Sequence, residues 1–184
     1  MKWIFDVILS LVLLILFFPF IALISLAIIL ETRGGIFFAQ ERVGQDDQPF
    51  QMYKFRSMVS GADRIGPYYT AKGDPRITRV GRFLRKTSLD ELPQLFNVLR
   101  GDMSLVGPRP DVFAQKSNYT EDEWEKRTQV KPGITGLAQA TIRNVGGPGQ
   151  RLALDLEYVD KASLWLDIKI IILTVKQVLF KGSH

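Results

Sequence analysis

The chain has 184 residues, enough for one domain with a short appended segment, and its formal net charge is +5. This positive excess suits anionic lipid headgroups, phosphorylated substrates or nucleic acid. The absence of cysteine excludes disulfides, zinc–thiolate sites and a cysteine nucleophile, and the one histidine is the last residue, His184. Catalysis must therefore use carboxylates, lysine, arginine, hydroxyl groups or a hard metal ion.

The first element is an almost wholly apolar stretch over residues 3–30, which we expect to be retained as a membrane helix. Such a helix is about 40 Å long, more than the roughly 30 Å hydrocarbon core of a bilayer requires. Pro19 removes a backbone hydrogen bond past its middle, which predicts a bend at Phe18-Pro19. Two arrangements stay open, a kinked single span and a helix that enters and leaves by the same face. Either places the polar remainder in the cytoplasm.

Two short β-prone runs follow, over residues 36–40 and 50–55, and the turn-rich stretch 44–49 between them predicts a small hairpin. Residues 60–75 contain several glycines and prolines and are predicted to form a loop. A helix is predicted next, over about 80–99.

The second half of the chain begins with a predicted loop over residues 101–110. Residues 120–123 match a capping box that starts a helix ending near Val130, and residues 131–136 interrupt the chain. The last third is predicted to be helical, with a join near Ser163.

The final helix, residues 164–180, is not cleanly amphipathic. Asp167 and Gln177 share one face, whereas Lys169 and Lys176 lie on roughly the opposite one. Two interpretations stay open. The helix lies at a membrane interface with its lysines reaching the headgroups, or it packs on the domain with two solvated edges.

A cationic strip runs directly into a pair of carboxylates. Guanidinium groups bind phosphate oxygens in a bidentate way, so the strip suits a diphosphate or a lipid phosphate, with a solvated basic face as the alternative. The carboxylates are Asp90 and Glu91. The strip consists of arginines at every third position, namely Arg76, Arg79, Arg82 and Arg85.

The two carboxylates have a structural and a chemical interpretation. A helix starting at Asp90 would place Pro93 in its first turn, so that Asp90 is an N-cap and Ser88 forms a capping box with Glu91. Alternatively, a carboxylate at a helix N-terminus beside arginines stays ionised at neutral pH, which a nucleophile attacking phosphorus requires. The residues alone leave both interpretations open.

Further basic candidates lie in a loop and on the hairpin. Arg109 stands between Pro108 and Pro110, which would mount its guanidinium rigidly, although a surface arginine in a proline-rich turn has the same pattern. Lys54 could contact phosphate or lie on a solvated strand face.

Several common nucleotide-binding motifs are missing from the sequence. There is no GxxxxGK[ST] loop, no strand-linked GxGxxG and no histidine-based metal motif. The aromatic residues cluster in the apolar stretch instead of alternating with basic residues, so we expect no nucleic-acid partner.

Residues 85–110 read RKTSLDELPQLFNVLRGDMSLVGPRP, and this segment strongly resembles the bacterial sugar transferases, the monotopic phosphoglycosyl transferases. The resemblance covers nearly the whole chain, and the length corresponds to the family's minimal catalytic core. It extends through FFAQERVG at 37–44, YKFRSM at 53–58, GDPRIT at 73–78 and KPGITGLAQ at 131–139.

We therefore predict a mostly helical α+β fold with a short β-hairpin and interfacial helices. The resemblance implies that residues 1–32 form a re-entrant membrane helix broken at Pro19. It also implies that residues 33–184 form a catalytic domain at the cytoplasmic face of the bacterial inner membrane. Many relatives break the helix at Ser-Pro, whereas this chain has Phe18-Pro19.

By the same resemblance, Asp90 is the nucleophile that attacks the sugar-bearing phosphate of a UDP-sugar and releases UMP. A polyprenyl phosphate, undecaprenyl phosphate in this family, then accepts the phosphosugar. Glu91 resembles a helper that places Mg²⁺ or handles a proton, so both carboxylates are expected metal ligands. A hard cation also follows physically, because a carboxylate that approaches a diphosphate must overcome charge repulsion.

The substrate-binding candidates are basic residues and the prolines beside one of them. Relatives differ from this chain after Gln139, so the donor sugar does not follow from the resemblance. Two alternatives remain: a glycosyltransferase that moves the sugar alone and releases UDP, and a non-catalytic membrane-anchored binder. The substrate-binding candidates named above are Lys54, Arg85, Pro108, Arg109, Pro110 and Arg143.

Overall fold

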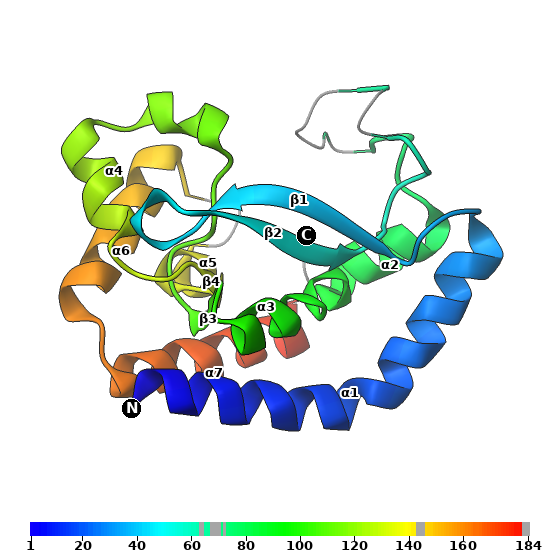
Figure 1. The fold of residues 1–184 in the computed structure, drawn as a ribbon, viewed down its shortest axis with the longest axis horizontal. Helices are drawn as coiled ribbons and strands as arrows, with labels where there is room; N and C mark the ends of the chain where they lie inside the picture. Colours follow the sequence, from blue (N-terminus) through cyan, green and yellow to red (C-terminus); the bar gives the residue numbers. More distant parts are fainter. Residues whose placement is uncertain (63–64, 67–70, 72, 143–145, 182–184) are drawn as a thin grey trace.

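A computed structural model describes residues 1–62, 65–66, 71, 73–142 and 146–181 (Figure 1). The predicted mostly helical fold with small sheets is confirmed. Arg143 lies outside the described residues. The elements are α1 (Lys2–Glu31), β1 (Phe37–Val43), the 3₁₀ helix η1 (Gln45–Asp47), β2 (Pro49–Phe55), α2 (Arg79–Thr87), η2 (Leu89–Glu91), α3 (Gln94–Arg100), β3 (Ser104–Val106), η3 (Phe113–Asn118), α4 (Glu121–Thr128), β4 (Gly133–Thr135), α5 (Leu137–Thr141), α6 (Pro148–Lys161) and α7 (Leu164–Lys181).

The long apolar helix α1 runs along one side of the molecule and changes direction part way along its length (Figure 1). It is assigned as one element with Pro19 inside it, and it is the one helix among the described residues that is long and apolar enough to cross a membrane. Most of its large apolar side chains are exposed. Such a surface needs an apolar surrounding, because water would oppose its exposure.

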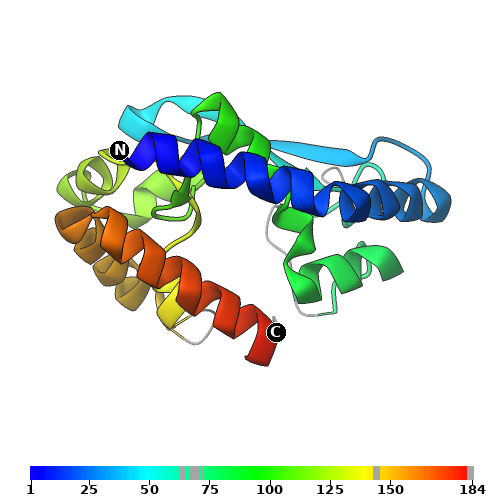
Figure 2. The ribbon, with the colours of Figure 1, turned by 90° about the horizontal axis from the view of Figure 1, so that it is seen from below.

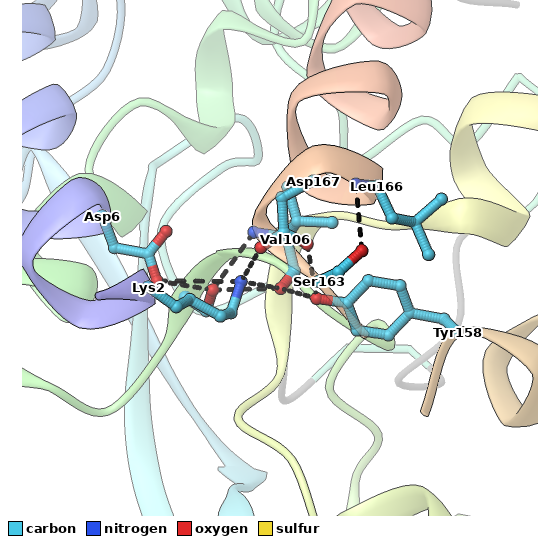
Figure 3. A network of polar contacts seen from close by, with 8 residues as sticks. Lys2, Asp6, Val106, Tyr158, Ser163, Leu166 and Asp167 are labelled. Atoms are coloured by element: carbon cyan, nitrogen blue, oxygen red, sulfur yellow. Dashed lines mark hydrogen bonds and ion pairs between the residues drawn. The ribbon is translucent and has the colours of Figure 1, made fainter. Parts of the chain in front are cut away.

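The first end of α1 is tied to the domain by buried polar groups (Figure 3). Lys2 Nζ donates to Asp167 Oδ2 at 2.6 Å and to the carbonyl oxygen of Val106 at 3.2 Å. The Tyr158 hydroxyl donates to the other carboxylate oxygen of Asp167 at 2.7 Å. Asp167 is fully buried, so its charge depends on these donors.

The second end of α1 is tied to the same domain. The Glu31 carboxylate accepts the backbone N–H groups of Arg79 and Val80, which are free donors at the start of α2. The Arg56 guanidinium donates to the carbonyl oxygen of Thr32 at 2.9 Å. Both ends of α1 therefore contact one polar domain.

The predicted hairpin is confirmed. Strands β1 and β2 pair antiparallel in a register that joins Phe37 to Phe55 and Val43 to Pro49. The expected capping box at the start of α4 is also present, because Thr120 and Glu123 exchange side-chain to backbone hydrogen bonds.

The predictions of a plain loop at residues 101–110 and a plain break at 131–136 were wrong. Each segment contains a three-residue strand, and β3 and β4 pair in parallel. A side chain at Gly107 or Gly133 would overlap the backbone of the other segment, so these glycines permit the close approach.

The single helix predicted over residues 80–99 was also wrong. Ser88 has a left-handed backbone (φ 58°) that ends α2, and α3 starts only after Pro93. Asp90 lies in the 3₁₀ turn η2 between them, and the proposed capping box of Ser88 and Glu91 is not formed. The two breaks turn this segment into a helix, a tight turn and a second helix.

Helix α7 packs on the domain through a face that combines polar residues with Ile170, which is fully buried. Asp167 is buried, Thr174 shares a 2.7 Å hydrogen bond with Thr135 of β4, and Gln177 bonds the Ala140 carbonyl. Apolar residues such as Trp165, which is 65% exposed, face outward. Seen from below, α1 and α7 begin near each other and diverge (Figure 2).

Candidate active site

The carboxylates of Asp90 and Glu91 are presented by the short turn between α2 and α3. The left-handed Ser88 reverses the chain after α2, and η2 then places Asp90 inward with only 8% of the residue exposed. The turn thus presents neighbouring carboxylates in one cavity. The two adjacent carboxylates have different neighbours and different burial, so their pKa values shift in opposite directions.

Glu91 is held by two cations. Its Oε1 accepts hydrogen bonds from Lys54 Nζ at 2.8 Å and from Arg109 Nη2 at 2.7 Å. Burial acts to raise the pKa of Glu91, but Arg109 and Lys54 outweigh it and hold the pKa below its ordinary value. Glu91 is therefore a fixed anion that positions two basic side chains.

Asp90 behaves in the opposite way. Burial, and then the charge of Glu91, raise the pKa of Asp90 above its ordinary value, although Lys54, Arg85 and Arg109 act to lower it. This direction differs from the effect expected of the arginines alone. A carboxylate of raised pKa is a stronger nucleophile once it is ionised, because it is more basic.

Arg85 reaches the site from α2 because that helix lies unusually close to the backbone of Ser57, which follows β2. A side chain at Gly81 would overlap the backbone of Ser57, and Arg85, one turn later, donates from Nε to Ser57 Oγ at 2.8 Å. Burial lowers the pKa of Arg85, and Asp90 opposes that effect.

The predicted cationic strip does not act as one surface. Arg79 and Arg82 are exposed and do not line the cavity. Arg76 lines it but forms a bidentate pair with Asp74. Of the four arginines only Arg85 acts on Asp90, because Arg76 precedes α2, and Arg79 and Arg82 lie on exposed positions of that helix.

Arg109 is mounted on a loop whose backbone is held at several points. The Gly107 N–H donates to the Thr135 carbonyl oxygen, and the Pro108 carbonyl accepts the Gly133 N–H, both at 2.9 Å. Pro108 and Pro110 are buried and fix this loop, whereas the Arg109 side chain is 49% exposed and lines the cavity. Glu91 raises the pKa of Arg109.

The structure adds Arg42, which the sequence analysis missed. The register of the hairpin puts Arg42 on the same face as Lys54. Its guanidinium donates to two neutral acceptors, the Pro110 carbonyl oxygen and Gln40 Oε1, and its buried Nε has no partner among the described residues. Burial, then Arg109, lower the pKa of Arg42. A charged residue at an inward position of an amphipathic strand was the signal that could have found it.

These residues line one open cavity of about 2390 Å³. It brings together five of the predicted site residues, Lys54, Arg85, Asp90, Glu91 and Arg109, with Arg42 added. Apolar side chains of α1 and α7, among them Leu13, Phe17 and Val175, line another part of its wall. The cavity therefore joins a cationic, carboxylate-bearing region to the apolar helices.

The donor set at this turn fits a magnesium ion that also binds a phosphorylated substrate. The described residues contain no group of three or more potential metal-ligating side chains. Mg²⁺ is commonly held by one or two carboxylates together with substrate phosphates and water, and Asp90 with Glu91 supplies that number. An all-protein metal cage does not fit this site.

The family model that matches this chain is that of the bacterial sugar transferases, and it covers residues 1–181. The chain therefore belongs to the bacterial sugar transferase family.

Curated relatives carry donor-specific names. The undecaprenyl-phosphate glucose phosphotransferase of Komagataeibacter xylinus is 44% identical over 97% of this chain. The UDP-glucose:undecaprenyl-phosphate glucose-1-phosphate transferase of Caulobacter vibrioides is 45% identical over 97% of it. The galactosyl transferase CpsE of Streptococcus agalactiae is 45% identical over 79%. The matches span 36%, 69% and 35% of the lengths of these relatives.

Proposed function

We propose that this protein transfers a sugar-1-phosphate from a UDP-sugar to undecaprenyl phosphate through a covalent intermediate on Asp90. The observation that carries the proposal is a buried aspartate in a cavity whose nearby cations, Lys54, Arg85 and Arg109, all act on its carboxylate. The names of two relatives support the donor and acceptor classes. The product would begin the assembly of a membrane-bound glycan.

In the first step, the Asp90 carboxylate attacks the phosphorus that carries the sugar. A bond forms between Asp90 and phosphorus, the bond to the bridging oxygen breaks, and UMP leaves with the electron pair. Arg85 and Arg109 are suited to bind the phosphate oxygens, because guanidinium groups stabilise the charge that builds on them. The phosphosugar remains on Asp90 as an acyl phosphate.

In the second step, a phosphate oxygen of undecaprenyl phosphate attacks the same phosphorus. The bond to Asp90 breaks, and the free carboxylate returns while a polyprenyl diphosphate sugar forms. The attacking phosphate is anionic, so this step requires no protein base. The apolar wall formed by α1 and α7 places a lipid chain within reach of the cationic end of the cavity.

Glu91 acts in this scheme by holding Lys54 and Arg109, which it binds through one oxygen. Its lowered pKa makes it a poor proton acceptor, which favours a positioning role over proton handling. Asp90 and Glu91 would hold Mg²⁺ together with the donor diphosphate, and the ion would supply neutralisation of the diphosphate charge.

We further propose that α1, residues 1–32 in our division of the chain, enters and leaves the membrane by the same face. Lys2 binds Asp167 at one end, and Glu31 caps α2 at the other, so a straight span would separate one end from its partners. A bend at Phe18-Pro19 would allow both contacts. Residues 33–184 would then form the catalytic domain on the cytoplasmic face of the inner membrane.

The catalytic proposal is tested by mixing purified protein, Mg²⁺ and individual UDP-sugars without the lipid acceptor. The expected result is an added phosphosugar mass on the intact protein, lost in Asp90→Asn, together with released UMP. Release of UDP with no adduct would instead support a transferase that moves the sugar alone. The Streptococcus relative is named as a galactosyl transferase, which is why this alternative is tested. Neither nucleotide, even with undecaprenyl phosphate present, would favour a membrane-anchored binder.

The topology proposal is tested with single cysteines, because the chain has none of its own. One cysteine is inserted between Met1 and Lys2, one replaces Arg33, and one replaces the exposed Glu125 in α4. A membrane-impermeant maleimide added to sealed vesicles should label all three from the same side. Labelling of the first cysteine from the opposite side would show a single span.

A further inference from the structure

Two polar side chains in the cavity carry buried atoms that have no hydrogen-bond partner among the described residues. The amide nitrogen and oxygen of Gln139 both lack a hydrogen bond, and so does Oδ1 of Asp155, which is only 5% exposed. Both residues line the cavity that contains Asp90. Buried polar atoms without partners cost folding free energy, so a pair of them in one cavity wall indicates a ligand that completes them.

Gln139 borders the loop that carries Arg109, and Asp155 is connected to that loop through Arg127. The Gln139 amide oxygen lies against Gly136, and a side chain at Gly136 would also overlap the Gly107 carbonyl, two residues before Arg109. On the other flank, Asp155 Oδ2 accepts from Arg127 Nε at 3.0 Å. Arg127 Nη2 in turn donates to the Arg109 carbonyl oxygen at 2.6 Å. Gln139 and Asp155 therefore flank the backbone of the Arg109 loop in the cavity that also contains Asp90.

We infer that Gln139 and Asp155 bind the hydroxyl groups of the donor's hexose and so set the donor preference, an inference that rests on the proposed function. An amide offers both a donor and an acceptor, and a carboxylate oxygen offers an acceptor, which together match neighbouring sugar hydroxyls. The hexose is attached directly to the phosphate that Asp90 would attack. Relatives of nearly equal identity to this chain are named for glucose and for galactose, so overall similarity does not set the donor.

The ribose of the nucleotide is a second source of the same hydroxyl chemistry, and the experiment separates the two. Calorimetry measures the binding of UDP, UDP-glucose, UDP-galactose and UDP-N-acetylglucosamine to Asp90→Asn protein, in which turnover is blocked. The same measurement is made after adding Gln139→Met or Asp155→Asn. Transfer rates with the three UDP-sugars are measured in the otherwise unchanged protein and in each single variant.

Gln139→Met should weaken binding of the preferred UDP-sugar about tenfold, the scale of one hydrogen bond, and leave UDP binding unchanged. Its melting temperature should not fall, because the lost amide had no partner in the protein. Asp155→Asn keeps an oxygen for Arg127 but turns the free acceptor into a donor, so it should change the ranking of the sugars. The matched control is Gln94→Met, which removes another buried amide whose nitrogen lacks a partner but which does not line the cavity.

The binding and transfer measurements can each contradict the assignment of Gln139 and Asp155 to the hexose. An equal loss for UDP and for UDP-sugars would assign the wall to the nucleotide and overturn it. Unchanged sugar ranking in both variants, with normal transfer by the unmodified protein, would overturn it while the proposed function stands. Sugar-selective binding without any transfer would sustain the subsite and overturn the proposed function. A change of ranking in Gln94→Met as large as in Gln139→Met would also overturn the inference.

Discussion

Lys54 in β2 and Glu91 in η2 are joined by a hydrogen bond of 2.8 Å, which fixes the hairpin against the turn that carries Asp90. Arg109 reaches the same oxygen of Glu91 from a third segment of the chain. Three parts of the fold thus meet at one carboxylate, and that contact determines how the cations surround Asp90.

Replacing Glu91 by Gln removes the charge that both cations share. We expect the free energy of unfolding at pH 7 to fall by about 1–3 kcal/mol. Because the pKa of Glu91 is lowered in the folded protein, its ionised form stabilises the fold above the ordinary pKa of about 4.3. That stabilisation is lost as the pH falls through the lower folded value. Thermal unfolding in detergent should show a difference between the two proteins that is full at pH 7 and shrinks below about pH 4.

Replacing Asp90 by Asn should abolish transfer, by at least about a thousandfold, without destabilising the protein. The pKa of Asp90 is raised in the folded state, so its ionised form costs folding free energy at neutral pH, and a neutral amide removes that cost. Thermal unfolding and UMP release measured on the same preparation check both parts. A lower melting temperature, or more than about 1% of the normal rate, would contradict this account.

The pH dependence of adduct formation gives a separate test of Asp90. The attacking carboxylate must be ionised, so the rate should fall as the pH drops through the raised pKa. This acid limb should lie above the value of about 3.9 that is ordinary for aspartate. Single-turnover measurements at donor concentrations well below saturation report it, because they follow the ionisation of the free protein. A rate that stays constant down to pH 4 would be inconsistent with the buried setting of Asp90.

Arg42 is expected to contribute to phosphate binding, because its guanidinium bonds only neutral acceptors among the described residues and one nitrogen is left over. Arg42→Gln should lower kcat/KM for the donor by about ten- to a hundredfold, and Arg42→Lys should recover only part of the loss. The matched control is Arg82→Gln, which removes the same charge from an exposed residue outside the cavity. Equal effects of Arg42→Gln and Arg82→Gln would show that only net charge matters.

Gly81→Ala should move α2 away from Ser57, because the added methyl group would overlap the Ser57 backbone. We expect a loss of about 1–3 kcal/mol in unfolding free energy and a lower kcat, since Arg85 follows one turn later. Gly147→Ala is the control, because open space surrounds that position. If Gly81→Ala behaved like the control in both denaturation and turnover, the close packing of α2 would not position Arg85.

The sequence predicted the elements whose signals are local. Two β-prone runs around a turn-rich stretch marked the hairpin, and the capping-box pattern at residues 120–123 marked the start of α4. No comparable local signal marks the parallel pair of β3 and β4, because each strand has three residues and the pairing depends on contacts between distant glycines.

The candidate site shows the same difference between local sequence signals and contacts that only the fold creates. Asp90, Glu91 and Arg109 were predicted as site residues through a long motif, but the motif does not show that Glu91 is shared by two cations or that burial raises the pKa of Asp90. The break at Ser88 was missed because a left-handed backbone at a non-glycine residue is stabilised by its surroundings and not by local propensity. Arg42 therefore became a candidate only once the three-dimensional arrangement was known.

The orientation of α7 makes its packing on the domain depend on the surrounding lipid. Its polar residues bond the domain while Trp165 and its apolar neighbours point away from it, so water and lipid would favour opposite rotations of this helix. Dilution below the critical micelle concentration should consequently weaken the packing of α7 along with the solubility of the protein. Since Thr174 and Val175 both line the cavity, the solvent chosen for purification also influences the shape of the site.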